Sequence, residues 1–371
     1  MKHVIFIVLI FSSVSLHSEP SGNFIETRAL MHYFFGTLLN MKPYMTSFEE
    51  FKRPKNSEKI VKELNGLKEK IITEPPSQLV NAAGFNYSYK LMAKHVGEII
   101  HLYELKIYMQ AWEKLNATPS FCIGCHTRLP EKANDEINQW SKLELTKGPS
   151  KSIDDAEFLF LSHQYSSAIE VYDSKIRSFD PKSGDKQELL KIYERKLAFF
   201  ARVIRDPKLA IESLNVDMKN VKLPPEVLAG IKTWIEGFKG LETKQMDSLQ
   251  YAKEIIKQNS SDRKIDLFDP TLIKLLFASG IIYERIFKVS KSDESADLLY
   301  MLALVERQLA PIRYYSLSDI YLFECVSLYP KSTIAKSCFR DYELNMKIKY
   351  GGTVPEFINL SIESLRKLVM H

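Results

Sequence analysis

The chain has 371 residues, 45% of them hydrophobic, and its 51 Lys and Arg against 46 Asp and Glu give a formal net charge of +5. An excess of positive charge this small and this evenly spread argues against a nucleic-acid-binding protein. The length suggests two domains. Only 14 glycines and little alternation of Val, Ile and Thr favour helices over sheets, so we expect an all-α fold.

The N-terminus has the pattern of an export signal. Lys2 supplies a positive start, the run from Val4 to Leu16 is mostly apolar, and Ser18 is the expected last residue before cleavage. The run is too short to span a bilayer comfortably, and no later stretch reaches ~18 apolar residues. We predict a signal peptide over 1–18 and a bacterial periplasmic protein. Membrane association would require that this signal remain uncleaved as an anchor.

Four helical segments are predicted in the next hundred residues from their apolar periodicity. In chain order they cover 23–42, 57–74, 77–97 and 99–117. Pro43 and Pro75 are expected to end the first two, because proline does not continue a helix. Gly97 is expected to separate the third from the fourth. The alternative is a third helix that continues unbroken to Asn116.

The sequence Cys122-Ile123-Gly124-Cys125-His126, near the end of the fourth segment, is the attachment motif of a c-type haem. Cys122 and Cys125 lie about one helical turn apart, so both sulfurs can reach the vinyl groups of one porphyrin. His126 is then placed to bind the iron as the proximal ligand. We predict one covalently bound haem c.

A zinc half-site or a redox-active cysteine pair would use the same spacing. Zinc would need a second pair of ligands, and the other two cysteines, Cys325 and Cys338, are distant from the motif. A thioredoxin-like site would need a βαβ context, which this helical pattern does not offer. Haem attachment is therefore the interpretation that we adopt.

The sixth iron ligand depends on which residues lie level with the motif. In an antiparallel bundle the end of the fourth helix lies beside the start of the first, which favours Met31 and His32. If the third helix continued unbroken to Asn116, the haem helix would start after Pro119, and the residues level with the motif would be Met41 or Met45. His95 is a further candidate, although a core histidine with a hydrogen bond needs no iron. An open sixth position is the remaining alternative.

Two arginines near the predicted haem are candidates for contacts with its propionates. They are Arg28 on the first helix and Arg128 just beyond the motif. A guanidinium group matches the geometry of a carboxylate, which favours such a pairing. Surface arginine is the alternative for both.

Four helices with Cys122 to His126 closing the last one resemble the class II cytochromes c, the cytochrome c′ and c556 type, over roughly residues 23–130. In six-coordinate members of this class a methionine of the first helix is the sixth ligand, which corresponds to Met31. In the c′ type the sixth position is empty and the haem binds small gases. This chain departs from the pattern through His32, next to Met31, and through Pro119, so the resemblance leaves the ligation open.

After Pro130 the sequence becomes polar, and 147–152 is the predicted domain boundary, with a haem domain over 19–146 and a second domain over 152–371. Residues 156–172 resemble a tetratricopeptide repeat, with small residues where two helices would touch and an aromatic residue at the hairpin. Later segments are more degenerate and lie around 196–211, 225–256, 271–289 and 296–317. We predict an α-solenoid of tetratricopeptide-like hairpins, with an irregular helical domain as the alternative.

The C-terminal segment from Leu317 to about Tyr350 is predicted to form a helical hairpin with a turn at Tyr329-Pro330. Cys325 and Cys338 lie on opposite sides of that turn, and we predict a disulfide between them in an oxidising compartment. Two buried free thiols are the alternative. The segment is similar to the tail of exported repeat proteins that also carry a haem-attachment motif.

The function that we expect is electron transfer by a periplasmic mono-haem cytochrome, which docks a redox or regulatory protein through its helical repeats. The alternative is a haem-based gas or redox sensor, or scaffold module, with an open sixth position. A peroxidase is disfavoured because the sequence has no short motif that would place an arginine and a histidine together on the distal side of the haem. No nucleophile triad or phosphate-binding loop supports hydrolytic chemistry.

Overall fold

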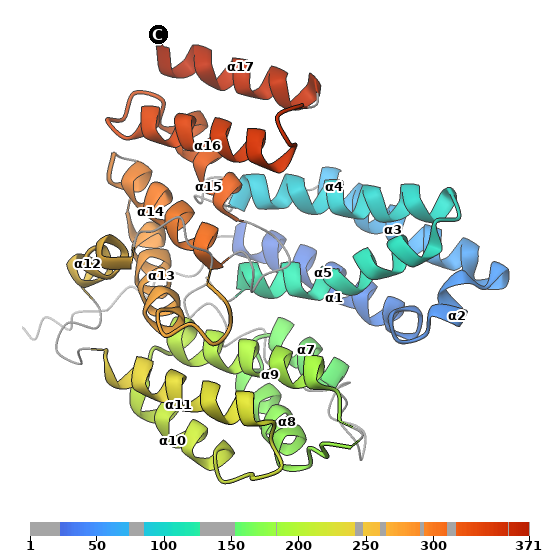
Figure 1. Ribbon diagram of the computed structural model, residues 1–371. Helices are drawn as coiled ribbons and strands as arrows, with labels where there is room; N and C mark the ends of the chain where they lie inside the picture. The colour runs from blue at the N-terminus through green and yellow to red at the C-terminus, as the bar shows by residue number, and fades with distance from the viewer. Residues whose placement is uncertain are drawn as a thin grey trace, which may run out of the picture.

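The computed structural model describes residues 23–73, 85–126, 153–182, 184–241, 248–259, 265–289, 293–309, 317–354 and 356–370. Within these ranges the chain has 16 α-helices and no strand, which confirms the expected all-α class (Figure 1). None of the helices described is long and apolar enough for a membrane crossing. The predicted signal peptide, Arg128 and the predicted domain boundary lie outside the described residues.

Residues 23–126, which we call the first half, form four long helices and two short ones, and residues 153–370 are called the second half. They are α1 (Asn23–Thr46), α2 (Phe48–Lys52), the 3₁₀ turn η1 (Pro54–Asn56), α3 (Ser57–Thr73), α4 (Phe85–Glu104) and α5 (Tyr108–His126). Helix α1 packs on α3 and α5, and α4 packs on α3 and α5. In Figure 1 the start of α1 and the end of α5 lie on the same side, and α2 lies at the opposite end.

Helix α1 does not end at Pro43 as predicted but continues to Thr46. Tyr44 and Met45, which follow the proline, are buried in the core. The indole Nε1 of Trp112 also donates to the Tyr44 carbonyl at 2.9 Å. Because Pro43 is exposed, water can solvate the carbonyl that loses its helical partner. Tertiary contacts therefore hold the last turn of α1 against the cost of an internal proline, about 3 kcal/mol.

The predicted break at Gly97 is also wrong, because α4 runs through this residue to Glu104. A glycine inside a helix costs only about 1 kcal/mol, and the burial of neighbours such as Val96 and Ile99 outweighs that cost. The chain turns instead at Lys106, which has a left-handed φ of 62°. The amide of Ile107 donates to the Leu102 carbonyl at 2.9 Å and closes the helix end. The alternative, a third helix that continues unbroken to residue 116, is also wrong, because the chain turns at Lys106.

The second half is a succession of helices, most of which contact the next helix in sequence. They are α7 (Ile153–Leu161), α8 (Tyr165–Arg177), α9 (Lys186–Ala198), the π-helix η4 (Phe199–Val203), α10 (Pro207–Asp217), α11 (Pro225–Lys239), α12 (Leu249–Asn259), α13 (Leu272–Lys288), α14 (Asp293–Leu309), α15 (Ser318–Leu328), α16 (Ala335–Lys349) and α17 (Glu356–Met370). Contacts also join helices two apart, as in α8 with α10, α11 with α13 and α15 with α17. Where the structure describes them, the predicted helical segments after residue 152 lie mainly on helices, and α17 is an addition that the sequence did not predict.

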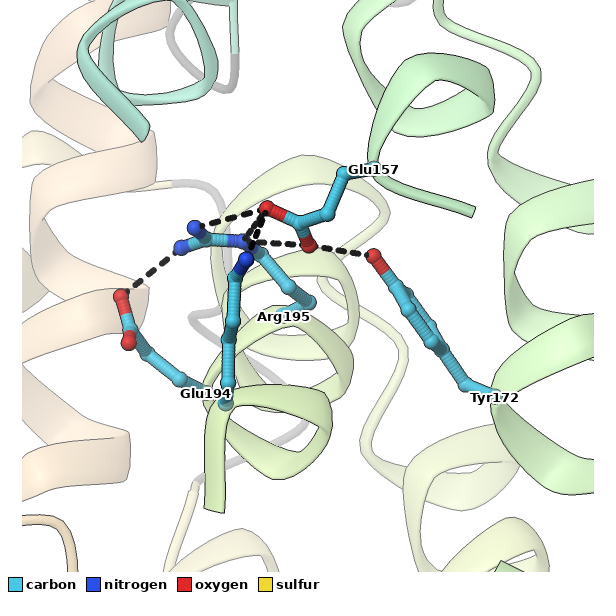
Figure 2. Close-up of polar contacts among 5 residues, drawn as sticks. Glu157, Tyr172, Glu194 and Arg195 are labelled. Atoms are coloured by element: carbon cyan, nitrogen blue, oxygen red, sulfur yellow. Dashed lines mark hydrogen bonds and ion pairs between the residues drawn. The ribbon is translucent and has the colours of Figure 1, made fainter. Parts of the chain in front are cut away.

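A buried ion pair fixes α7 to the two helices that follow it. Glu157 of α7 accepts hydrogen bonds from Arg195 of α9, with Nη2 to Oε2 at 3.1 Å, and from the Tyr172 hydroxyl of α8 at 2.8 Å (Figure 2). Burial by itself raises the pKa of Glu157, but the charges of Arg195 and Lys191 outweigh burial and bring this pKa to about 2. The carboxylate therefore stays ionised at any ordinary pH.

A second ion pair in the second half is more deeply buried than the pair of Glu157 and Arg195. Arg202 of η4 and Glu306 of α14 are both fully buried, with Nη2 3.0 Å from Oε1. The guanidinium also donates through Nε to Ser279 at 2.8 Å, and the Tyr283 hydroxyl donates to Glu306 at 2.9 Å. These contacts join η4, α13 and α14 through charged groups inside the core.

The two halves touch through α7 and α15. The Phe35 and Phe158 rings lie edge to face with centroids 6.0 Å apart, and Lys42 of α1 forms an ion pair with Asp155 of α7. Helix α15 contacts α4. Helix α7 lies along the middle and C-terminal part of α1, where Phe35 and Lys42 are, and it also contacts α5 (Figure 1).

Cys325 of α15 and Cys338 of α16 form the predicted disulfide, with their Cα atoms 6.2 Å apart and both side chains fully buried. The bond joins two antiparallel helices across the turn between them. It therefore fixes the C-terminal hairpin, whose first helix contacts α4.

Replacing both Cys325 and Cys338 by alanine is expected to lower the free energy of unfolding by about 3 kcal/mol. The disulfide closes a short loop, and its loss restores chain entropy to the unfolded state. Urea unfolding followed by circular dichroism, with and without a thiol reductant, measures this change. The reductant should destabilise the wild type and leave the double variant unchanged. Equal unfolding midpoints for the oxidised wild type and the double variant would contradict the prediction.

Candidate haem-attachment site

The haem motif occupies the last turns of α5, which ends at His126. Ala111, Leu115 and Thr118 form the buried stripe of this helix, with exposed fractions of 0%, 1% and 2%. Cys122, which is partly buried and packs against the core, continues the stripe four residues further on. Position 125 falls on the same stripe by helical geometry. Cys122 therefore lies on the core-facing side of α5.

The start of α1 lies level with the motif. The hydrogen bond from Trp112 to the Tyr44 carbonyl sets the register between the antiparallel helices α5 and α1. His126 lies 14 residues beyond Trp112, and Leu30 lies 14 residues before Tyr44, so both ends are about 21 Å from this bond at 1.5 Å per residue. Met31, next to Leu30, is therefore level with the end of the motif.

The other ligand candidates divide according to this register. His32 shares the level of Met31, and both side chains are partly buried. Met41 and Met45 are buried beside Tyr44, nearer the opposite end of α1. Arg28 lies on α1, but its side chain is outside what the structure describes.

His95 is engaged between α4 and α5 and is 3% exposed. Its Nε2 lies 3.1 Å from the Thr118 hydroxyl oxygen. Burial, with a smaller contribution from the positive charge of Lys114, lowers the pKa of His95 from 6.5 to about 4. The imidazole is thus neutral near pH 7. This arrangement supports the interpretation of His95 as a hydrogen-bonded core residue.

The unfolding free energy is expected to fall by up to about 3 kcal/mol as the pH is lowered from 6.5 to 4, owing to His95. Its folded pKa is depressed, so over this range the unfolded chain binds the proton that the folded chain excludes. Urea unfolding at a series of pH values measures the effect. His95→Gln should remove this part of the pH dependence, whereas His101→Gln, on the exposed face of α4, should retain it. An unchanged pH profile in His95→Gln would contradict the assignment.

The residues present at this end of the first half fit a covalently attached haem. Cys122 and Cys125 would hold the porphyrin from one stripe of α5, and His126 would bind the iron. The buried apolar residues on α1 and α4 at this level would contact the porphyrin face; they are Leu30, Phe34, Tyr89 and Met92. The Phe34 and Tyr89 rings stack with centroids 6.4 Å apart. An apolar wall of this kind limits the access of water to a haem edge.

No group of three or more His, Cys, Asp and Glu side chains suited to a metal ion occurs among the described residues. The side chains of Cys125 and His126 are not among those described, so this finding does not bear on the haem motif. Sequence patterns also missed the contact between His95 and Thr118. The available signal was a histidine and a threonine within the apolar stripes of neighbouring helices.

No protein-family model matches the chain, and neither a curated protein nor a solved structure matches it. The site is therefore interpreted from its own residues and from their positions on the helices.

Proposed function

We propose that this protein is an exported mono-haem c-type cytochrome that transfers electrons in the periplasm. The observation that carries the proposal is the position of Cys122 to His126. The motif closes helix α5, Cys122 prolongs the buried stripe of that helix, and the start of α1 lies level with it. A redox pair or zinc half-site would not need an apolar wall on the facing helices.

The architecture that fits this proposal is a four-helix haem bundle of the class II type followed by a helical solenoid. The mutual packing of α1, α3, α4 and α5 supports the bundle. The contacts between helices two apart in the second half support stacked hairpins, in which each hairpin covers the apolar face of its neighbour. The solenoid is the surface through which a redox or regulatory protein would dock.

A bound haem supplies an iron that cycles between the ferric and ferrous states. The two cysteines would tether it, so the cofactor is retained in both states. Apolar residues such as Phe34 and Met92 would exclude water from its face, which affects the reduction potential through burial. Met31 or His32 would complete the coordination of the iron in a simple electron carrier, because a six-coordinate iron keeps its ligands in both states.

A haem-based sensor is the second candidate function, and the contact between the two halves favours it. Helix α5, which ends in the motif, contacts α7, and α15 contacts α4. A ligand that bound at an open sixth position would then act next to the repeat half. The electron carrier remains our first proposal, because Met31 and His32 stand level with the motif.

The absorption spectrum of the reduced protein, with and without carbon monoxide, separates the two functions. We expect a low-spin spectrum that the gas does not change, because the sixth position is filled. Methionine and histidine ligation can then be told apart by Met31→Ala and His32→Ala variants, one of which should become high-spin. Rapid binding of carbon monoxide to a high-spin ferrous haem in the wild type would contradict the electron-carrier proposal and favour the sensor.

A further inference from the structure

The last two turns of α5 follow a proline. Pro119 is buried within the helix and lacks the N–H that would bond to the Leu115 carbonyl. An internal proline interrupts the helical ladder and kinks the axis. The helix continues through the proline with one hydrogen bond fewer, so the orientation of residues 119–126, which include the whole predicted haem motif, depends on how firmly the preceding turn is held. Side-chain contacts with neighbouring helices must contribute.

Helix α4 supplies two such contacts immediately before the proline. Glu98 forms an ion pair with Lys114 at 2.8 Å, and one turn further along α5 His95 meets Thr118 at 3.1 Å. The first pair is partly exposed, and its contribution is accordingly small. The second pair is buried, where a polar group left without its partner is costly.

The geometry of the hydroxyl group makes the buried pair directional. Thr118 donates to the Lys114 carbonyl at 3.3 Å, and its oxygen lies 3.1 Å from Nε2 of His95, which donates to it in the tautomer that carries the proton on Nε2. These contacts hold α5 in the rotation that turns Thr118 towards α4. Cys122 and position 125 follow Thr118 at four and seven residues, so they share its direction.

We infer that His95 is a positioning residue for haem attachment. Through Thr118 it sets the rotation of the segment after Pro119, so that both cysteine positions face the interior of the first half. The inference rests on the proposed cytochrome function, and it assigns to His95 a role in orienting the motif and none as an iron ligand.

The test compares the full-length wild type, expressed with a haem-attachment system, with His95→Leu, Thr118→Val and His95→Gln. Thr37→Val, which removes the hydroxyl of another buried threonine on α1, is the matched control. Three quantities are measured: amide hydrogen exchange of residues 119–126, the fraction of chains with covalent haem, and the electron paramagnetic resonance spectrum of the ferric iron. Circular dichroism verifies that each variant is folded.

We expect His95→Leu and Thr118→Val to accelerate exchange in residues 119–126 by about tenfold, the effect of losing one hydrogen bond. They should also lower the haem-bearing fraction and add a second set of g values. His95→Gln, which keeps an N–H donor, should restore much of the wild-type behaviour, and Thr37→Val should resemble the wild type.

Two results would overturn the inference separately from the function. If the wild type carries haem but His95→Leu leaves the haem fraction and the spectrum unchanged, His95 does not position the motif, even if exchange accelerates. If His95→Gln behaves like His95→Leu, the hydrogen bond is not the cause. A wild type without covalent haem would instead overturn the proposed function itself.

Discussion

Replacing Cys122 and Cys125 together by alanine is expected to leave the exported chain without covalently bound haem. The two thioether bonds need both sulfurs, and within the motif His126 alone would hold a haem only by iron coordination, which denaturation breaks. Haem staining of a denaturing gel and the intact mass of the purified chain measure the attachment. The wild type should show the mass of one haem added to the processed chain, and the double variant should show none.

The control is the pair of cysteines that forms the disulfide. Replacement of Cys325 and Cys338 by alanine should leave one haem per chain, because these residues lie in the second half on α15 and α16. The single variant Cys125→Ala should keep one thioether bond. If it still held haem through two thioether bonds, the attachment argument would fail.

The second large effect is expected from Arg202→Met. This substitution leaves the carboxylate of Glu306 buried with Tyr283 but without its guanidinium partner. Removing one partner of a buried ion pair costs about 3–5 kcal/mol, since an uncompensated charge stays in the core. Chemical unfolding followed by circular dichroism should show this loss as a lower midpoint or as a separate early transition of the second half.

Two further variants show whether charge or volume causes that loss. The double variant Arg202→Met, Glu306→Leu removes both charges and should be more stable than Arg202→Met alone, because no unpaired carboxylate remains. Arg285→Met removes an arginine that is exposed beside Glu294 and should change the midpoint little. A double variant as unstable as the single one would mean that lost packing, and not the buried charge, dominates.

The helical segments of the first half were predictable because their apolar residues recur at helical spacing. The ends of those helices were not, since proline and glycine were weighed without their tertiary contacts. Pro43 and Pro119 both lie inside helices, and Gly97 does not interrupt α4. The chain turns at Lys106, which has a left-handed φ, and a lysine in the sequence does not indicate that conformation.

The buried charges of the second half show a similar limit. Glu157 and Arg195 appear in the sequence as ordinary charged residues 38 positions apart, and only the fold brings them together. The disulfide was predictable because covalent chemistry depends on residue type and spacing. The contact between His95 and Thr118 depends on the register of two helices, which periodicity does not define.

The contact between Phe35 and Phe158 bears on how the first half can be studied in isolation. A fragment that ended at residue 146 would lose α7, and the aromatic ring of Phe35 and the ammonium group of Lys42 would lose the partners they have there. The surface uncovered would run along α1 from its middle towards its C-terminal end, where Phe35 and Lys42 lie. Such a fragment is expected to associate with itself, so its spectrum and potential would not be those of the haem in the intact chain.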